Sequence, residues 1–288
     1  MLRKIQFLFV STLLLTEGAV TQAQSLSEPI RDSGNSVTAA FEGWFQNPDG
    51  TFSILLGYMN RNQKEELDVP IGPNNRIEPG GPDMGQPTHF FPRRGWGVFT
   101  ITVPNDFGAK KLTWTLTANG TTTAVPVSLN TLWELAPFKD ATENTPPYIG
   151  FSEKGPFVSG PKGQSTALNA VAGVPVTIPV WVSDDAHVSP GAPKIPLPPV
   201  SLAWSKFRGP GTVTLSKDRP AVVPSVLSAA PASGKFQGKA ETTATFAEPG
   251  EYVLKVTAND WSGEGGRGFQ CCWSNAQVKV SVKAGGAN

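Results

Sequence analysis

Short runs in which apolar and polar residues alternate recur along this chain, and they constrain its fold more than any other feature. Two clear examples are the runs GVFTITVP and LTWTLTA. The apolar positions of one parity are Phe99, Ile101 and Val103 in the first run and Leu112, Trp114 and Leu116 in the second. Because successive side chains of a strand point to opposite faces, each run predicts a half-buried strand of a sandwich. The nearest approach to a helical pattern is Ser128–Ala136, which is either a short helical turn or a last strand.

Turn residues separate these runs in the way that β-hairpins require. In the sequence NPDG, Pro48 presets its own φ and Gly50 accepts the positive φ that closes a hairpin. Asn119 and Gly120 form a second hairpin signal between two β-rich runs. The same asparagine begins an Asn-Gly-Thr glycosylation pattern, although the flanking strands already explain it as a turn. With 30 glycines and 27 prolines in 288 residues, the chain is predicted to be all-β.

The N-terminus has the pattern of a secretory signal peptide. Arg3 and Lys4 precede an apolar run over residues 5–15, and small residues allow cleavage after Ala23. The run is too short for a bilayer, which needs about 20 apolar residues, and it is apolar on all sides, which disfavours an amphipathic first helix. No later transmembrane segment is expected. We therefore predict a secreted or periplasmic protein in an oxidising compartment.

The mature chain predicts two β-sandwich (Ig-like) domains in tandem. About 265 residues remain after the signal peptide (residues 1–23), which is long for one domain. The polar, proline-ended segment APFKDATENTPP predicts a linker over residues 138–147, between domains at 28–137 and 148–284. Cleavage removes Arg3, Lys4 and Glu17, so that 24 basic and 23 acidic residues become 22 and 22. A nucleic acid partner is therefore not expected.

The second domain carries a recognisable set of motifs. It contains the sequences WSKFRGPGTV and TTATFAEPGEYVLKVTAND. The matching positions are Trp204, Gly209, Pro210, Gly211, Val213, Phe246, Pro249, Gly250, Tyr252, Leu254, Val256 and Asp260. In these, residues 146–284 resemble the immunoglobulin-like PKD domains of bacterial extracellular proteins, although the WDFGDG-type motif is absent. The resemblance implies that Trp204 packs between two sheets and that Tyr252 forms a tyrosine corner. It implies nothing about a ligand, and no family is recognised for the first domain.

A long segment of turn residues lies between the hairpins of the first domain, from Asn60 to Trp96. Long irregular loops are usually functional or mobile, and this one ends in aromatic rings mixed with guanidinium groups. Such mixtures stack on sugars or bases, or pair with carboxylates. Alternatively, the aromatic rings cover the open end of the sandwich. The candidates for a ligand surface are His89, Phe91, Arg93, Arg94, Trp96 and Trp273.

The two cysteines, Cys271 and Cys272, are neighbours in the sequence. The parity of the last strand, which places Val278 and Val280 in the core, predicts that Cys272 faces inward and that Cys271 and Trp273 face outward. A zinc site needs about four ligands, and a redox pair is more often C-x-x-C. We rank a vicinal disulfide first, two free thiols second, and a link to another chain through Cys271 third.

Signals for catalysis are poor. His89 and His187 lie outside any H-E-x-x-H spacing, and no serine lies in a G-x-S-x-G elbow. The G-x-G-x-x-G pattern at residues 263–268 precedes a strand and predicts the tip of a hairpin. Asp184, Asp185 and Asp260 end two strands and are candidates for calcium, although capping of turns by aspartate explains them equally. We predict no catalytic residue and no cofactor other than this calcium.

Together these features predict a secreted, non-enzymatic bacterial protein for binding, adhesion or structural spacing, with a carbohydrate or a protein as its partner. The alternative is an extracellular carbohydrate-active hydrolase, or an accessory subunit of one, that uses the segment from Asn60 to Trp96. Such an enzyme needs two carboxylates about 5–10 Å apart. The candidates are Glu65, Glu66, Asp68, Glu78 and Asp83.

Overall fold

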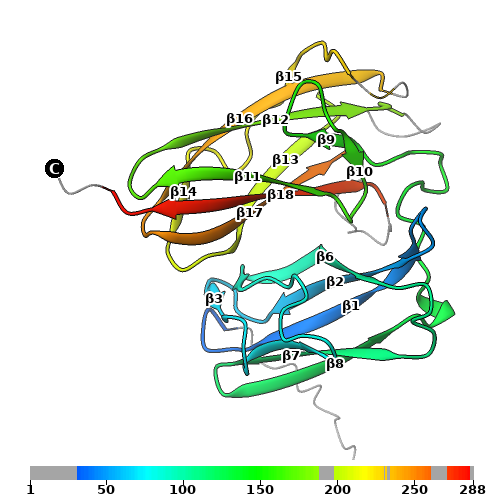
Figure 1. Ribbon diagram of the computed structural model, residues 1–288, viewed down its shortest axis with the longest axis vertical. Helices are drawn as coiled ribbons and strands as arrows, with labels where there is room; N and C mark the ends of the chain where they lie inside the picture. Colours follow the sequence, from blue (N-terminus) through cyan, green and yellow to red (C-terminus); the bar gives the residue numbers. More distant parts are fainter. Residues whose placement is uncertain (1–30, 188–197, 230, 232–233, 261–270, 286–288) are drawn as a thin grey trace, which may run out of the picture.

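The computed structural model consists of two β-sandwiches, one above the other (Figure 1). It describes residues 31–187, 198–229, 231, 234–260 and 271–285. In this part of the chain, the only helical element is a short 3-10 turn, and no helix is long and apolar enough to cross a membrane. The predicted fold class, all-β with two Ig-like sandwiches, is confirmed. The predicted signal peptide and the predicted hairpin tip at residues 263–268 lie outside the described residues.

The first sandwich packs a sheet with the strand order β1-β2-β6 against a sheet with the order β4-β7-β8, and β3 pairs with β5 beside them. Its elements are β1 (Val37–Gln46), β2 (Phe52–Asn60), β3 (Leu67–Asp68), β4 (Asn75–Glu78), β5 (His89–Phe90), β6 (Arg93–Val103), β7 (Lys111–Ala118), β8 (Thr121–Ser128) and the 3-10 turn η1 (Thr131–Trp133). The core between the sheets contains Ile54, Leu56, Phe90, Phe99 and Trp114. Of the two alternatives for residues 128–136, the structure therefore shows the short helical turn.

The local predictions for this sandwich are confirmed. β1 and β2 are joined by the NPDG turn, in which Gly50 has a φ of +83°. Asn119 and Gly120 form the two-residue turn between β7 and β8, both with positive φ. The two predicted apolar stripes are buried, with exposures of 5% or less at Phe99, Ile101, Val103, Leu112, Trp114 and Leu116.

The segment from Asn60 to Trp96 is more regular than its turn-rich sequence predicts. β4 adds a strand to the second sheet by pairing with β7. β6 begins at Arg93, four residues before the predicted run, because residues 93–95 pair with 58–60 of β2 across a bulge. The prediction of an irregular loop was therefore wrong for these stretches, since pairing with distant strands orders residues that have no alternating pattern of their own.

The second sandwich packs a sheet with the order β10-β9-β12-β16-β14 against one with the order β11-β18-β17-β13, and β15 also pairs with β16. Its strands are β9 (Tyr148–Gly150), β10 (Val158–Ser159), β11 (Gln164–Val171), β12 (Val176–Asp184), β13 (Ser201–Arg208), β14 (Val213–Leu215), β15 (Val223–Pro224), β16 (Phe236–Phe246), β17 (Gly250–Asn259) and β18 (Trp273–Lys283). β11 runs parallel to β18, and the other pairs are antiparallel. Residues 138–147, the predicted linker, run between η1 and β9.

The core positions predicted for the second sandwich are buried. Trp204 is 5% exposed and packs in the core between the sheets. The Tyr252 hydroxyl donates to the Glu248 carbonyl at 2.9 Å and accepts from the Gly211 N–H at 3.1 Å, which makes the predicted tyrosine corner. The inward parities of β17 and β18 also hold, with exposures of 5% or less at Tyr252, Leu254, Val256, Ala258, Ala276, Val278, Val280 and Val282.

The second sandwich inserts a side chain into the core of the first. Phe207 at the end of β13 is 3% exposed and belongs to the core cluster of the first sandwich. Its carbonyl accepts from the Thr88 N–H at 3.1 Å. The next residue, Arg208, makes a bidentate ion pair with Asp83 at 2.8 and 2.9 Å. These contacts fix the position of one sandwich against the other.

The N-terminal end of β18 lies next to the first sandwich. This contact corrects two predictions. Cys271 and Trp273, predicted to face outward, are 1% and 2% exposed. Trp273 lies against Gly97 of β6, and Asn275 donates to the Gly97 carbonyl at 2.8 Å. The Cys271 sulfur faces the backbone of Asn144. The outer face of this sheet is therefore covered where β18 begins, which the parity of a single strand cannot reveal.

Candidate functional site

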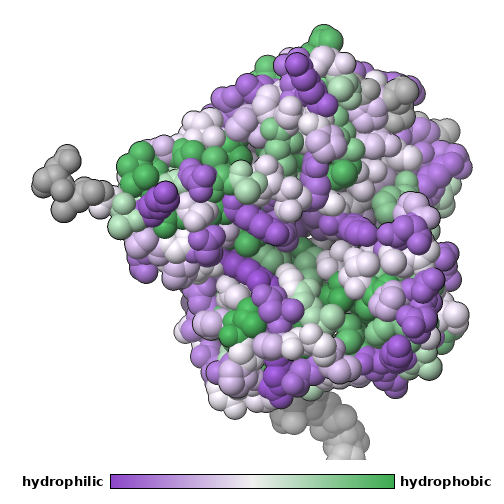
Figure 2. All heavy atoms as spheres, viewed as in Figure 1, coloured by the Kyte–Doolittle hydropathy of each residue, from purple (hydrophilic) through white to green (hydrophobic). Residues whose placement is uncertain are grey.

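A cleft opens between the two sandwiches beside the Phe207 contact. It consists of two adjoining hollows of about 470 and 290 Å³ that share part of their lining. On the face drawn in Figure 2, hydrophilic residues gather along the junction of the two sandwiches. The lining residues used below are Glu66, Asp68, His89, Phe91 and Trp96 from the first sandwich and Lys206, Asp218 and Arg219 from the second.

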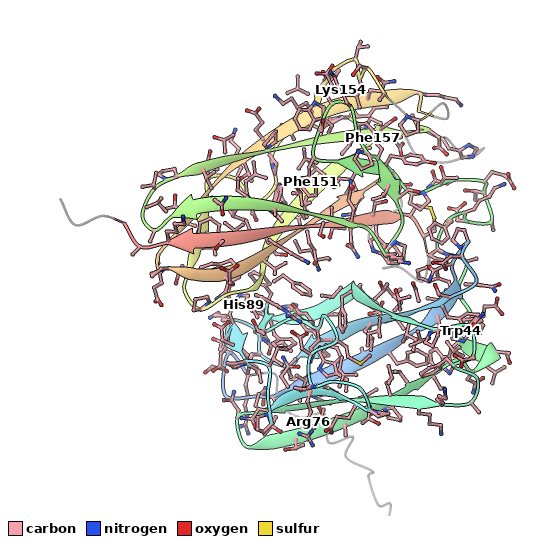
Figure 3. The ribbon with its side chains drawn as sticks, viewed as in Figure 1. Trp44, Arg76, His89, Phe151, Lys154 and Phe157 are labelled. Atoms are coloured by element: carbon pink, nitrogen blue, oxygen red, sulfur yellow. A yellow bond between two sulfur atoms is a disulfide. The ribbon has the colours of Figure 1, made fainter. Side chains whose placement is uncertain are left out.

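His89 is held between two carboxylates at the edge of the cleft. Its Nδ1 lies 2.9 Å from Asp68 Oδ1, and its Nε2 lies 3.2 Å from Glu66 Oε2. The short β3–β5 ladder pairs residue 68 with residue 89 and so sets this geometry. A neutral imidazole has a single N–H, so both contacts are hydrogen bonds only when the ring is an imidazolium. Lys206 Nζ reaches Asp68 at 3.3 Å from the second sandwich. Figure 3 shows His89 on the side of the first sandwich that faces the second.

Trp96 is backed by an ordered guanidinium group. The Arg94 Cζ atom lies 4.1 Å from the centroid of the Trp96 ring. Arg94 is itself fixed by Glu42 at 2.8 Å and by the carbonyls of Tyr58 and Gly95 at 2.9 and 2.7 Å. Trp96 remains 42% exposed and lines the cleft. The cleft therefore has an aromatic wall that is held in place before any ligand arrives.

Glu42 lies at the bulge of β1 and is largely enclosed. Burial raises the pKa of its carboxyl, and the nearby Arg94 charge and the Gly97 N–H at 2.8 Å oppose this rise. Gly57 of β2 leaves the room that this contact needs, because a Cβ there would lie 2.1 Å from Glu42 Oε1. The Glu42–Arg94 pair thus depends on a glycine in the neighbouring strand.

The structure brings together some of the predicted ligand residues but not all. His89, Phe91 and Trp96 line the cleft, with the rings of His89 and Phe91 edge to face at 4.6 Å. Arg94 lies behind Trp96. Arg93 is exposed and its guanidinium lies 3.4 Å from Gln63, outside the cleft lining. Trp273 is buried against the first sandwich and offers no ring face to a ligand, so its choice as a surface residue was wrong.

The wall formed by the second sandwich was missed from the sequence. Lys206 lies 138 residues after Asp68, with which it pairs, and its sequence context indicates only a strand. Asp218 and Arg219 lie in residues 217–237, whose proline, serine and alanine content predicts only a surface loop. The one available signal was the length of this segment, which does not indicate what it faces.

Cys271 and Cys272 are joined by a disulfide, with their Cα atoms 3.1 Å apart. Both are buried, and the Cys272 sulfur faces the Asn144 carbonyl at 3.4 Å. This is the first of the three arrangements considered from the sequence. A pair bonded in this way supplies neither a thiol nucleophile nor a metal ligand.

The three aspartates proposed for calcium lie at one end of the second sandwich. Asp184 and Asp185 each accept a backbone N–H two residues on, from Ala186 at 2.8 Å and His187 at 2.9 Å, which fits the capping of turns. Burial, and then the charges of Asp185 and Asp260, raise the pKa of Asp184 to about 7. Among the described residues, no group of three or more His, Cys, Asp or Glu side chains is arranged to hold a metal ion. Calcium binding stays a prediction.

The acidic residues of the segment from Asn60 to Trp96 are distributed among different contacts. Glu65 accepts the Gly34 N–H at 2.7 Å, Glu78 pairs with Arg76, and Asp83 pairs with Arg208. Glu66 and Asp68 line the cleft on either side of His89. These two are therefore the carboxylates to test for hydrolysis.

Comparisons with known proteins find similarity of fold alone. No family model matches the chain, and no curated protein matches it. Solved structures with similar folds include domains 4 and 5 of the S-layer protein SbsC, at 12% identity and a TM-score of 0.22, over 60% of this chain and 65% of that one. The D00-D0 domain of intimin aligns at 13% identity and a TM-score of 0.24, over 85% of this chain and 98% of that one. An endo-fucoidan hydrolase of glycoside hydrolase family 107 aligns at 11% identity and a TM-score of 0.22, over 76% of this chain and 28% of that one.

The chain spans less than two thirds of the first S-layer structure, and 31% of a longer S-layer fragment. At these TM-scores the likenesses carry no argument about function. The functional conclusion depends on the cleft and on the way in which the sandwiches are joined.

Proposed function

We propose that this chain is a secreted, non-enzymatic binding or adhesion protein in which two Ig-like sandwiches act as one rigid unit. The observation that carries the proposal is the insertion of Phe207 into the core of the first sandwich. A side chain shared in this way couples the two sandwiches, whereas interfaces between domains are by default mobile. A rigid unit keeps the two walls of the cleft at a fixed separation, as a binding surface requires.

The setting of the protein is proposed from several features of the sequence. The signal-peptide pattern supports export, and a structural disulfide is compatible with an oxidising compartment. The motifs around Trp204 and Tyr252 support a PKD-type domain of a bacterial extracellular protein. Such domains serve mainly as spacers and adhesion modules, and a carbohydrate or a protein is the partner that we propose.

The non-enzymatic character is supported by the contacts of the polar side chains. Both ring nitrogens of His89 face carboxylates, so the ring has no free nitrogen to act as a base toward a ligand. The disulfide occupies both sulfurs. A second candidate function is glycoside hydrolysis, which is favoured by one observation: Glu66 and Asp68 both line the cleft.

The test uses the whole mature chain, residues 24–288. Its binding to isolated bacterial cell envelopes and to immobilised polysaccharides is measured, together with the release of reducing ends from the same polysaccharides. We expect saturable binding without release of reducing ends. Release that is abolished in both Glu66→Gln and Asp68→Asn would replace this proposal with the hydrolase.

A further inference from the structure

We propose that the cleft binds a neutral oligosaccharide, with Trp96 as the stacking surface and both sandwiches contributing polar groups. This inference rests on the proposed binding function and gives it a site and a chemistry. The full set of residues that line the cleft could not be predicted from the sequence, because many of them belong to the second sandwich.

Trp96 has the properties of a sugar-stacking residue. Aromatic rings present a large flat surface to the C–H face of a sugar, and the free energy gained is greatest when the ring does not have to be ordered on binding. The guanidinium of Arg94 lies against the Trp96 ring, and that guanidinium is fixed by Glu42. The indole is 42% exposed on a strand and not on a free loop. The ring is therefore preorganised.

The polar groups of the cleft suit hydroxyl groups, which both donate and accept hydrogen bonds. Asp218 offers acceptors and Arg219 offers donors from the second sandwich, opposite Trp96 of the first. Glu66 is 52% exposed at its side chain and keeps acceptor capacity beyond its contact with His89. A sugar ring held over Trp96 would find both a donor, Arg219, and an acceptor, Asp218, in the lining of the same hollow.

The balance of charge favours a neutral ligand over a polyanion. The acidic side chains of the two hollows taken together are Glu66, Asp68 and Asp218, and the basic ones are Lys206, Arg219 and Lys255, besides His89. Opposite charges are interspersed, as in the Lys206–Asp68 pair at 3.3 Å. A site for a polyanion needs a field of one sign, which the two hollows together do not provide because Glu66 and Asp68 line the first of them. The two hollows, of about 470 and 290 Å³, fall near the range of about 300–1,000 Å³ for small-ligand sites.

A protein partner would use this region differently. Protein interfaces bury about 800 Å² on each partner and centre on a well-packed patch, whereas here the aromatic ring lines a recess. A protein that covered the rim would leave the recess unfilled. The oligosaccharide is therefore the occupant that fits the shape.

The experiment measures binding of defined probes to residues 24–288 by isothermal titration calorimetry. The probes are cello-, xylo-, manno-, malto- and chito-hexaose, with a heparin hexasaccharide as the polyanion. The variants are Trp96→Ala and Asp218→Asn. The matched control is Trp133→Ala, because Trp133 is also half exposed but lies on η1, outside the cleft lining. Each variant is first shown to keep the circular dichroism spectrum of the wild type.

We expect at least one neutral hexaose to bind, with affinity reduced at least about tenfold in Trp96→Ala and changed less than about twofold in Trp133→Ala. Binding of the heparin probe alone, unchanged binding in Trp96→Ala, or binding to none of the neutral probes would overturn the inference. Adhesion to cell envelopes that persists in Trp96→Ala would reject the cleft as the site and leave the proposed function standing. Capture of a protein ligand that is lost in Trp96→Ala would reject the sugar.

Discussion

Trp273 of β18 lies so close to Gly97 of β6 that a Cβ atom at Gly97 would stand 2.4 Å from Trp273 Cζ2. Gly97 also has a φ of +48°, which L side chains rarely adopt. The Asn275 side chain completes the contact by donating to the Gly97 carbonyl. One glycine therefore lets the last strand of the second sandwich dock on the first, and the burial of Trp273 follows from it.

Substitution Gly97→Ala should lower the free energy of unfolding by about 2–4 kcal/mol, because it adds backbone strain of about 1–2 kcal/mol and a clash with the indole. Gly108→Ala is the matched control: Gly108 has a φ of +56°, and its nearest atom to an added Cβ lies 3.8 Å away. It should show the strain alone, about 1–2 kcal/mol. Urea unfolding measures both. Equal losses in the two variants would mean that Trp273 does not constrain Gly97.

Substitution Phe207→Ala should uncouple the sandwiches. The large cavity left in the core of the first sandwich should cost about 3–5 kcal/mol, although the residue belongs to a strand of the second. Calorimetry should show one transition for the wild type and two for the variant. Phe246→Ala is the control, since Phe246 is fully buried in the core of the second sandwich alone. A lowered transition confined to the second sandwich in Phe207→Ala would contradict the coupling.

The sequence predicts what is local here and misses what is distant. The hairpin at Asn119 and the tyrosine corner at Tyr252 are encoded within a few residues, so their patterns were sufficient. β4 was missed because its order comes from pairing with β7, about 35 residues further on. The burial of Trp273 depends on a surface some 175 residues away. The candidate site divides in the same way. The aromatic residues from His89 to Trp96 could be chosen from the sequence, but the wall that the second sandwich contributes could not.

The pKa of Asp184 predicts a dependence of stability on pH. Its folded pKa of about 7 lies above the ordinary pKa of 3.8, so the folded state binds more protons than the unfolded state between these pH values. The contribution of Asp184 to stability should therefore be greatest below about pH 4, decrease as the pH rises to about 7, and stay level above that. The loss amounts to at most about 4 kcal/mol, because a tenfold difference in proton affinity between the two states corresponds to about 1.4 kcal/mol.

Asp184→Asn removes this titration and keeps an acceptor for the Ala186 N–H. The variant should be more stable than the wild type at pH 8, with a difference that vanishes near pH 4. Urea unfolding at pH 4, 6 and 8 measures it, with the exposed Asp106→Asn as control. A variant that is less stable than the wild type at pH 8 would show that the Asp184 charge is compensated, for instance by a bound cation.

The state of Cys271 and Cys272 can be decided by mass spectrometry. Since both side chains are buried, the mature protein is unfolded in guanidinium without reductant before it is alkylated. The disulfide predicts no adduct in this sample and two adducts in a matched sample that is reduced first. Two adducts without reduction would establish free thiols instead. A covalent dimer that disappears on reduction would establish the link to another chain. The buried position of Cys271 against Asn144 supports neither the free thiols nor this link.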